Sequence, residues 1–346
     1  MGTVKNKQSM VKQKKRILLG AIVLFLGVFI LSFFLGKYPI AMNDFFRAVL
    51  NKMIPLKQTW SSQVETILFK IRFPRIIMAV VIGSGISVAG ATYQALFQNQ
   101  MISQDILGAS QGAAFGAAIG LFFSLRYEQV ISLSFTFGLL AVGAVLMINR
   151  WLRSHSVLTI VLIGMMIGSL FSSAVSFLKL VGDPTNTLPA ITYWLMGSLS
   201  AIKMQDLHFA VPLILAGMVP IFLLRWRLNI ISLGEEEALS LGVNSGQLRV
   251  LLIIAATLIT AAAVSVSGLI GWVGLIVPHA SRLLIGNDHR YSIPVTAILG
   301  GTFLLVVDDV SRLVSTSEIP IGILTSFIGA PVFLILIAKN SRSMRE

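Results

Sequence analysis

Ionisable residues inside an apolar stretch are the first candidates for chemistry in this sequence. Asp308 and Asp309 precede Arg312 within the run LLVVDDVSRL. On a helix, residues three and four apart share a face, so an internal ion pair of Asp308 with Arg312 is one interpretation. A proton pathway through the acids is the other, because charges at membrane depth are costly and usually functional. The residues alone leave both interpretations open.

Two further arginines, Arg72 and Arg75, flank a proline at the start of another apolar stretch. A proline in the first turn predicts that a helix begins there. Together with Arg312, these arginines could contact lipid headgroups in water. Alternatively, they could form a cluster that binds carboxylates on an incoming partner.

The motifs that would let the chain run its own chemistry are missing. The sequence has no GxxxxGK[ST] phosphate loop, no HExxH metal motif and no cysteine. The four histidines, His155, His208, His279 and His289, are scattered. We therefore expect a protein that is not an enzyme, binds no metal or cofactor of its own, and takes its energy from a partner or a gradient.

The elements that carry these residues are predicted to be membrane-spanning helices. The chain is 55% hydrophobic and only 12% charged, so its apolar surface calls for lipid rather than water. Segments of bilayer length without period-two alternation favour an all-α fold. We expect about ten spans, at 17–36, 74–97, 106–125, 129–148, 157–178, 208–224, 250–267, 272–285, 292–312 and 321–338.

The distribution of basic residues predicts the orientation. An even number of spans puts both termini on one side, and the excess of Lys and Arg on that side indicates the cytoplasm. We divide the chain into a basic cytoplasmic N-terminus (1–16), a transmembrane domain (17–338) and a cytoplasmic tail (339–346). The net charge of +13 is thus explained by topology, without nucleic acid as a partner.

Two long linkers are expected to lie on opposite faces of the membrane. The outer one, 179–207, contains a short interfacial helix in ITYWLMGSLS. The cytoplasmic one, 225–249, contains SLGEEEALSLGVNS, where three glutamates favour a helix start and Gly242 a helix stop. A short amphipathic helix between two spans is a candidate docking element for a cytoplasmic partner.

Several motifs resemble the permease subunits of ABC importers for iron–siderophore, haem and cobalamin, the FecCD-type family. The resemblance runs from about residue 70 to 338. It is carried by RFPR (72–75), GSGISVAGATYQALFQN (83–99), DILGASQGA (105–113), SGLIGWVGLIVPHASRLLIGNDHR (267–290), LLVVDDVSRL (304–313) and EIPIGILTSFIGAPVFLILI (318–337).

The resemblance implies partners and site residues. Partners are a second permease subunit, identical or not, two cytoplasmic ATPases that use ATP and Mg, and an extracytoplasmic binding protein, all at a bacterial cell membrane. The outer arginines that would meet the binding protein are Arg72, Arg75 and Arg312. The segment that would couple to the ATPase contains Glu236, Glu237, Ala238 and Gly242. The cytoplasmic gate would be Ser154, His155 and Ser156. For the gate, an ordinary polar turn is the alternative.

The expected function is inward passage of an iron(III)–siderophore-type chelate. Haem and cobalamin are alternative cargoes within the same family. A different class of protein, a gradient-driven secondary transporter that uses Asp308 and Asp309 for proton coupling, is the rival hypothesis.

Overall fold

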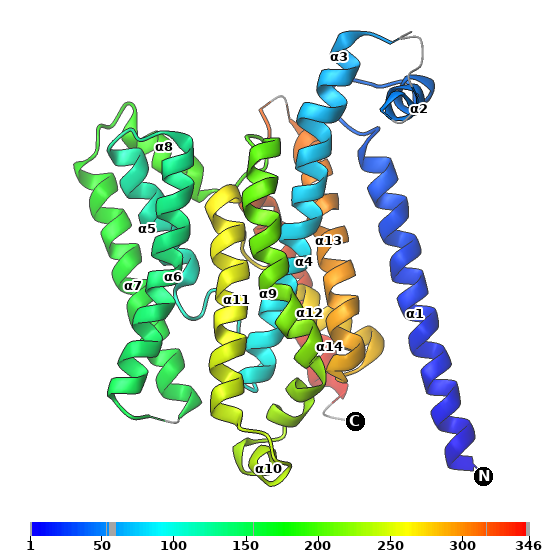
Figure 1. The fold of residues 1–346 in the computed structure, drawn as a ribbon, viewed down its shortest axis with the longest axis vertical. Coiled ribbons are helices and arrows are strands. Elements are labelled where there is room, and N and C mark those ends of the chain that lie inside the picture. The colour runs from blue at the N-terminus through cyan, green and yellow to red at the C-terminus, as the bar shows by residue number, and fades with distance from the viewer. Residues whose placement is uncertain (1, 53, 55–59, 155, 316, 344–346) are drawn as a thin grey trace.

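The computed structural model describes residues 2–52, 54, 60–154, 156–315 and 317–343, and every regular element in them is a helix. Figure 1 shows a helical bundle with α3 and α8 at one end and α10 at the other. The start of α1 and the end of α14 lie at the α10 end. The helices are α1 Gly2–Ser32, α2 Met42–Asn51, α3 Ser62–Glu65, η1 Thr66–Arg72, α4 Phe73–Leu96, α5 Ala109–Phe122, α6 Tyr127–Trp151, α7 Val157–Val181, α8 Thr187–Leu195, α9 Met204–Ile231, α10 Glu235–Ser240, α11 Ser245–Ser267, α12 Val273–Ile285, α13 His289–Val314 and α14 Ile321–Ser343.

The all-α membrane fold expected from the sequence is confirmed, with ten of these helices overlapping the ten expected segments. Seven helical stretches are long and apolar enough to cross a bilayer. Three others are apolar but shorter: Ala109–Phe122, Val273–Ile285 and Ile321–Ile335. The number of crossings and the side of the termini stay predictions.

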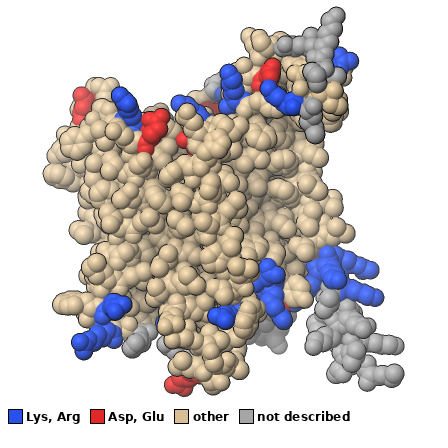
Figure 2. Space-filling model, viewed as in Figure 1, with Lys and Arg blue, Asp and Glu red and all other residues tan. Residues whose placement is uncertain are grey.

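Charged side chains are confined to the two ends of the bundle on the face seen in Figure 2, with a broad uncharged belt between them. This is the surface expected of a protein surrounded by hydrocarbon, where an exposed charge is costly. The α8 end corresponds to the predicted outer side and the α10 end to the predicted cytoplasmic side.

The helix α4 lies at the centre, packed against α9, α11, α12 and α13. Glycines allow this close packing: a Cβ atom on Gly90 would lie 1.9 Å from the carbonyl oxygen of Gly274 on α12. On α5, a Cβ on Gly116 would lie 2.3 Å from the carbonyl oxygen of Leu133 on α6. Small residues at helix contacts are the usual means of close approach in membranes.

Three elements differ from the sequence-based boundaries. The second span does not begin at residue 74, because α3, η1 and α4 form one helical stretch, Ser62–Leu96, that projects beyond the bundle. The segment before it folds into α2, which the apolar pattern did not predict. The third span is shortened, because residues 97–108 are not helical and Gly108 packs against Gly168 at the middle of α7.

Candidate functional site

A buried carboxylate, Asp308, lies between two guanidinium groups near the α8 end of α13. Its side chain is fully buried, and Nη2 of Arg75 lies 2.8 Å from Oδ1. Nε of Arg75 also donates to both carboxylate oxygens at 2.9 and 3.0 Å. Nε of Arg312, one helical turn away, lies 3.3 Å from Oδ2. Asp308 therefore joins α4 to α13 and is not a simple partner of Arg312.

The neighbouring acid, Asp309, extends this cluster to α1. It accepts a hydrogen bond from the Ser32 hydroxyl at 2.5 Å and forms an ion pair with Arg312. Nη1 of Arg312 also donates to the carbonyl oxygen of Leu35, at 3.3 Å. The two acids of α13 thus share Arg312, while of these two acids Arg75 contacts only Asp308 and Ser32 only Asp309, and both acids are buried.

The third arginine, Arg72, binds backbone carbonyls that follow the end of α1. Nη1 donates to the Phe33 carbonyl at 2.5 Å, and Nη2 donates to the Tyr38 carbonyl. Carbonyl groups at a helix C-terminus lack intrahelical partners, and a basic side chain can satisfy them. Arg72 therefore fastens the end of α1 to the start of α4.

A π-helical segment determines the positions of Arg72 and Arg75. The segment Thr66–Arg72 is a π-helix that ends directly before Phe73 and Pro74. Pro74 lacks an N–H group, which breaks the regular hydrogen-bond ladder at this point. Such π-helical turns are frequent at functional sites. Here the turn carries Arg72 and Arg75 to the face that meets α1 and α13.

Sequence reasoning missed one member of the cluster, Glu318. Its Oε2 atom lies 2.8 Å from Nη1 of Arg75, and its side chain is 29% exposed. It belongs to the loop between α13 and α14, which is also held by a 2.6 Å hydrogen bond from the Ser311 hydroxyl to the Ile319 carbonyl. An acid shortly after the α13 charges was the only available signal.

The structure brings together the three arginines predicted to form an outer cluster. Arg72, Arg75 and Arg312 are only 4 to 6% exposed, and each contacts carbonyl or carboxylate groups of this chain. Their role in docking a binding protein stays a prediction. In this conformation, the partly exposed carboxylate of Glu318 forms an ion pair with Arg75.

The predicted coupling segment folds into α10 at the opposite end of the bundle (Figure 1). Gly242 has a φ of +75° and donates to the Leu239 carbonyl, while Val243 donates to the Ala238 carbonyl, both at 2.9 Å. This pair of bonds is a Schellman motif, which requires a left-handed residue at the position of Gly242. The glycine therefore ends the helix as the sequence predicted.

One side of α10 is anchored and the other is open. Ala238 is fully buried, whereas Glu236 and Glu237 are exposed. Leu239 and Leu241 are each 59% exposed beside these acids. A rigid helix with an exposed apolar and acidic surface suits contact with another protein. Its role in coupling to an ATPase stays a prediction.

The predicted gate lies in the turn between α6 and α7. Ser156 precedes α7, and its backbone N–H donates to the Ser154 hydroxyl at 3.2 Å. His155 lies outside the described residues. The local bonds are those of an ordinary polar turn, so the gate assignment remains a prediction.

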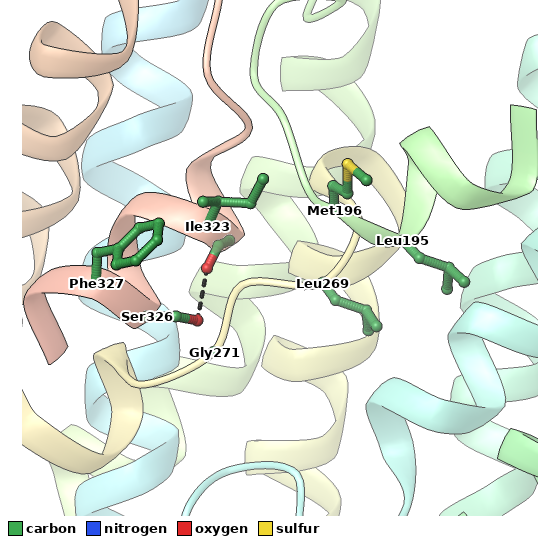
Figure 3. Close-up of a pocket in the computed structure, with 8 residues that line it drawn as sticks. Leu195, Met196, Leu269, Gly271, Ile323, Ser326 and Phe327 are labelled. Atoms are coloured by element: carbon green, nitrogen blue, oxygen red, sulfur yellow. Dashed lines mark hydrogen bonds between the residues drawn. The ribbon is translucent and has the colours of Figure 1, made fainter. Parts of the chain in front are cut away.

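A pocket of about 560 Å³ opens between the chain after α8, the loop before α12 and the start of α14. Figure 3 shows Met196, Leu269 and Ile323 around it, and the hydroxyl of Ser326 donates a hydrogen bond to the Gly322 carbonyl at 2.8 Å. The pocket is mainly apolar. Its walls meet through backbone bonds, since the N–H groups of residues 321 and 322 donate to the carbonyls of residues 197 and 196.

The helix α7 carries an exposed polar stripe. Ser169, Ser172 and Ser176 are exposed at spacings of three and four residues, and Ser173 beside them is exposed too. Residues at these spacings lie on one face of a helix. A hydroxyl group that faces hydrocarbon finds no hydrogen-bond partner outside its own helix, so this face is suited to water or to another protein chain.

A partly buried acid, Asp105, lies behind this stripe and was not predicted. It accepts hydrogen bonds from the Ser110 hydroxyl and from Nε2 of Gln104, the latter at 2.9 Å. It lines a pocket of about 390 Å³ together with Ser169 and Ser172 of α7. The non-helical residues 97–108 carry it to this depth. The described residues contain no group of three or more His, Asp or Glu residues that could hold a metal ion.

Comparison with known proteins gives a consistent result. Residues 23–339 match the FecCD transport family. The chain is 36% identical over 328 residues to the molybdate import system permease protein MolB of Haemophilus influenzae, covering 94% of this chain and 96% of MolB. It is 31% identical over 338 residues to the Fe(3+)-citrate import system permease protein YfmE of Bacillus subtilis, covering 96% and 98%.

A solved structure agrees with this assignment. A metal-chelate type ABC transporter in an inward-facing conformation superposes with a TM-score of 0.84 and 35% identity. The match covers 94% of this chain and 99% of that one. The chain therefore belongs to the FecCD transport family and is the permease of an ABC importer, a transport protein rather than an enzyme.

Proposed function

We propose that this permease passes a large, preformed metal chelate of the iron(III)–siderophore type into the cytoplasm, between two permease subunits. A separate ATPase would supply the energy at α10, and an extracytoplasmic binding protein would deliver the cargo at the α8 end. The cell membrane of a bacterium is the expected location.

The observation that carries this proposal is the serine stripe on α7. On a helix packed against hydrocarbon, the exposed hydroxyls of Ser169, Ser172 and Ser173 would find no partner outside the helix. Ser176, on the same face, already donates to the Ser172 carbonyl at 3.0 Å. Water in a passage, or a second subunit across it, satisfies the other three hydroxyls. The pocket beside α14 and the polar pocket at Asp105 supply further lining for such a passage.

The described residues also support a preformed chelate over a bare metal ion. A bare cation would need several carboxylate or imidazole ligands, and no such group is found among the described side chains. One relative is named for the import of Fe(3+)-citrate, which is a metal complex, and another for the import of molybdate. Haem and cobalamin stay alternative cargoes.

The contacts of Asp308 argue against the rival, a proton-driven transporter. A proton relay needs a carboxylate that can lose its partners and reach water. Asp308 is fully buried between Arg75 and Arg312, and both of its carboxylate oxygens contact guanidinium groups. We interpret the acids of α13 as structural.

The absence of cysteine provides a clean test of the passage. The variant Ser172→Cys should react with a charged, membrane-impermeant thiol reagent, and bound cargo should slow the reaction. Leu215→Cys, on an exposed apolar position of α9, is the matched control and should stay unlabelled in lipid. Equal labelling of both positions, or none at Ser172→Cys, would contradict the passage.

Transport itself is tested in proteoliposomes that contain the permease, its ATPase and its binding protein. Uptake of a radiolabelled ferric chelate should require ATP and continue in the presence of a protonophore. Uptake by the permease alone that stops with the protonophore would instead favour the rival. Preferential uptake of haem or cobalamin would keep the mechanism and change the cargo.

A further inference from the structure

We propose that a pocket between α6 and α11 binds the phosphate headgroup of an anionic phospholipid in the cytoplasmic leaflet. The pocket lies at the α10 end and has a volume of about 840 Å³. The proposal rests on the orientation assumed in the proposed function, and it assigns this chain a regulatory ligand distinct from its cargo.

Three arginines from two helices line this pocket. Arg150 and Arg153 come from the end of α6, and Arg249 comes from the first turns of α11. None of the residues lining the pocket is an acid. Guanidinium groups bind phosphate oxygens through paired, charge-assisted hydrogen bonds, so the exposed pair Arg150 and Arg153 matches a phosphodiester.

The backbone holds one of these arginines in a costly conformation. Arg153 has a φ of +51° and follows the end of α6 at a position where glycine is usual. The turn is fixed by a 3.2 Å hydrogen bond from Nδ2 of Asn149 to the Ser154 carbonyl. Both Asn149 and Ser154 line the pocket, so the turn presents polar groups beside the arginines.

The depth of the pocket corresponds to the headgroup layer. Trp151, in the last turn of α6, is 80% exposed, and tryptophan prefers the boundary between headgroups and hydrocarbon. Arg150 and Arg153, on either side of it in the sequence, both line the pocket. A phosphate bound in the pocket at this level could therefore contact both guanidinium groups.

An apolar surface continues from the pocket toward the centre of the membrane. Met147 and Val250 line the pocket and are 73% and 44% exposed. One or two turns further, Leu140 on α6 and Ile254 on α11 are 54% and 52% exposed. These positions share helix faces with the pocket residues, since they follow at spacings of seven and four residues. They give the acyl chains a surface directly joined to the headgroup site.

The pocket has a direct connection to the proposed gate. Ser154 belongs both to the pocket lining and to the predicted gate turn. A bound headgroup would hold the turn between α6 and α7, so the lipid composition of the membrane would influence the opening of the cytoplasmic side.

Native mass spectrometry of the full-length permease, released from membranes of mixed phosphatidylglycerol and phosphatidylcholine, tests the site. The wild type should retain phosphatidylglycerol in preference to phosphatidylcholine. The double variant Arg150→Gln/Arg153→Gln should weaken this retention by about 25-fold, since each arginine near an anionic surface contributes roughly a factor of five. The matched control, Arg225→Gln/Arg227→Gln, removes the same charge from α9 and should retain phosphatidylglycerol.

Each other outcome has a defined meaning. Equal retention of both lipids by the wild type, or an equal loss in the control, would overturn the proposal. If inorganic phosphate binds to the permease in pure phosphatidylcholine as strongly as phosphatidylglycerol does, the site is one for free oxyanions. Arg150→Lys/Arg153→Lys keeps the charge but loses the paired hydrogen bonds, so it should restore part of the retention, and this recovery excludes misfolding as the cause. No ATPase or cargo is involved, so failure here is separate from failure of the transport assay.

Discussion

Replacing Asp308 with asparagine tests whether the buried ion cluster holds α1, α4 and α13 together. The change keeps the shape of the side chain and removes the negative charge between Arg75 and Arg312, whose side chains are 5% and 7% exposed. Removing one partner of a buried ion pair typically costs about 3–5 kcal/mol, because the remaining charge is uncompensated. Arg75 keeps Glu318 and Arg312 keeps Asp309, so we expect the lower end, about 3 kcal/mol.

Thermal unfolding of the purified permease in detergent measures this effect. At roughly 2 °C per kcal/mol for a chain of this size, Asp308→Asn should lower Tm by about 6 °C. Glu128→Gln, at an exposed position at the same end of the bundle, is the control and should leave Tm unchanged. An Asp308→Asn variant as stable as this control would refute the structural role of the cluster.

The exchange variant Asp308→Arg/Arg312→Asp separates a network from an isolated pair. In an isolated pair, exchanging the two residues would preserve the attraction. Here the new arginine at 308 would face Arg75 and the new aspartate at 312 would face Asp309, so both contacts become repulsive. We expect lower stability than for Asp308→Asn. Recovery of the wild-type Tm by the exchange would show that Arg75 contributes little.

Three further predictions concern the two ends of the bundle. Glu318→Gln should strengthen binding of the binding protein a few-fold in a titration if Arg75 docks it, because the internal competitor for that guanidinium is neutralised; unchanged affinity would make Arg75 purely structural. Gly242→Val should reduce the uptake driven per ATP hydrolysed, since a β-branched residue disfavours a φ of +75°, whereas Gly246→Ala in α11 should not. At Asp288, burial by itself would raise the pKa, but hydrogen bonds from Arg290 and Asn229 outweigh it and lower the pKa to about 2. This carboxylate therefore stabilises the fold above its unfolded pKa of about 4, and the contribution disappears as pH falls through 2. Asp288→Asn should cost about 1 kcal/mol at pH 7 after allowance for solvent screening, and the difference from wild type should shrink in denaturation experiments as pH falls toward 2.

Hydropathy was sufficient to predict the helical spans, because each is an apolar segment bounded by charge, proline or glycine. The same signal failed where the chain departs from simple crossing. Residues 106–108 were assigned to the third span because they are apolar, but they belong to the non-helical segment 97–108, and their path depends on Gly108 fitting against α7. The helix α2 was missed because its apolar residues occupy one face only and never form a long run.

For the candidate sites, too, the sequence predicts contacts within one helix but not contacts between distant segments. The acids and arginines of α13 could be paired from sequence, since residues three and four apart must be neighbours on a helix. The bond between Arg75 and Asp308 joins residues 233 positions apart, and no local pattern reports such a contact. Burial was the second missing quantity: a charged residue in a sequence is presumed to face water, and only packing shows that Arg72 faces the end of α1.

The loop between α13 and α14 gives the outer cluster a physical connection to the passage. Glu318 binds Arg75, and two residues before α14 begins its neighbour Ile319 accepts the Ser311 hydroxyl. The first residues of α14 then bond to the carbonyls of Gly197 and Met196 beside the pocket of Figure 3. A partner that displaced Glu318 from Arg75 would release one end of this short segment, while its other end forms the pocket wall. Energetic coupling between two sites can be carried by a contiguous element of this kind. Here only a few residues of one loop separate the arginine cluster from the pocket.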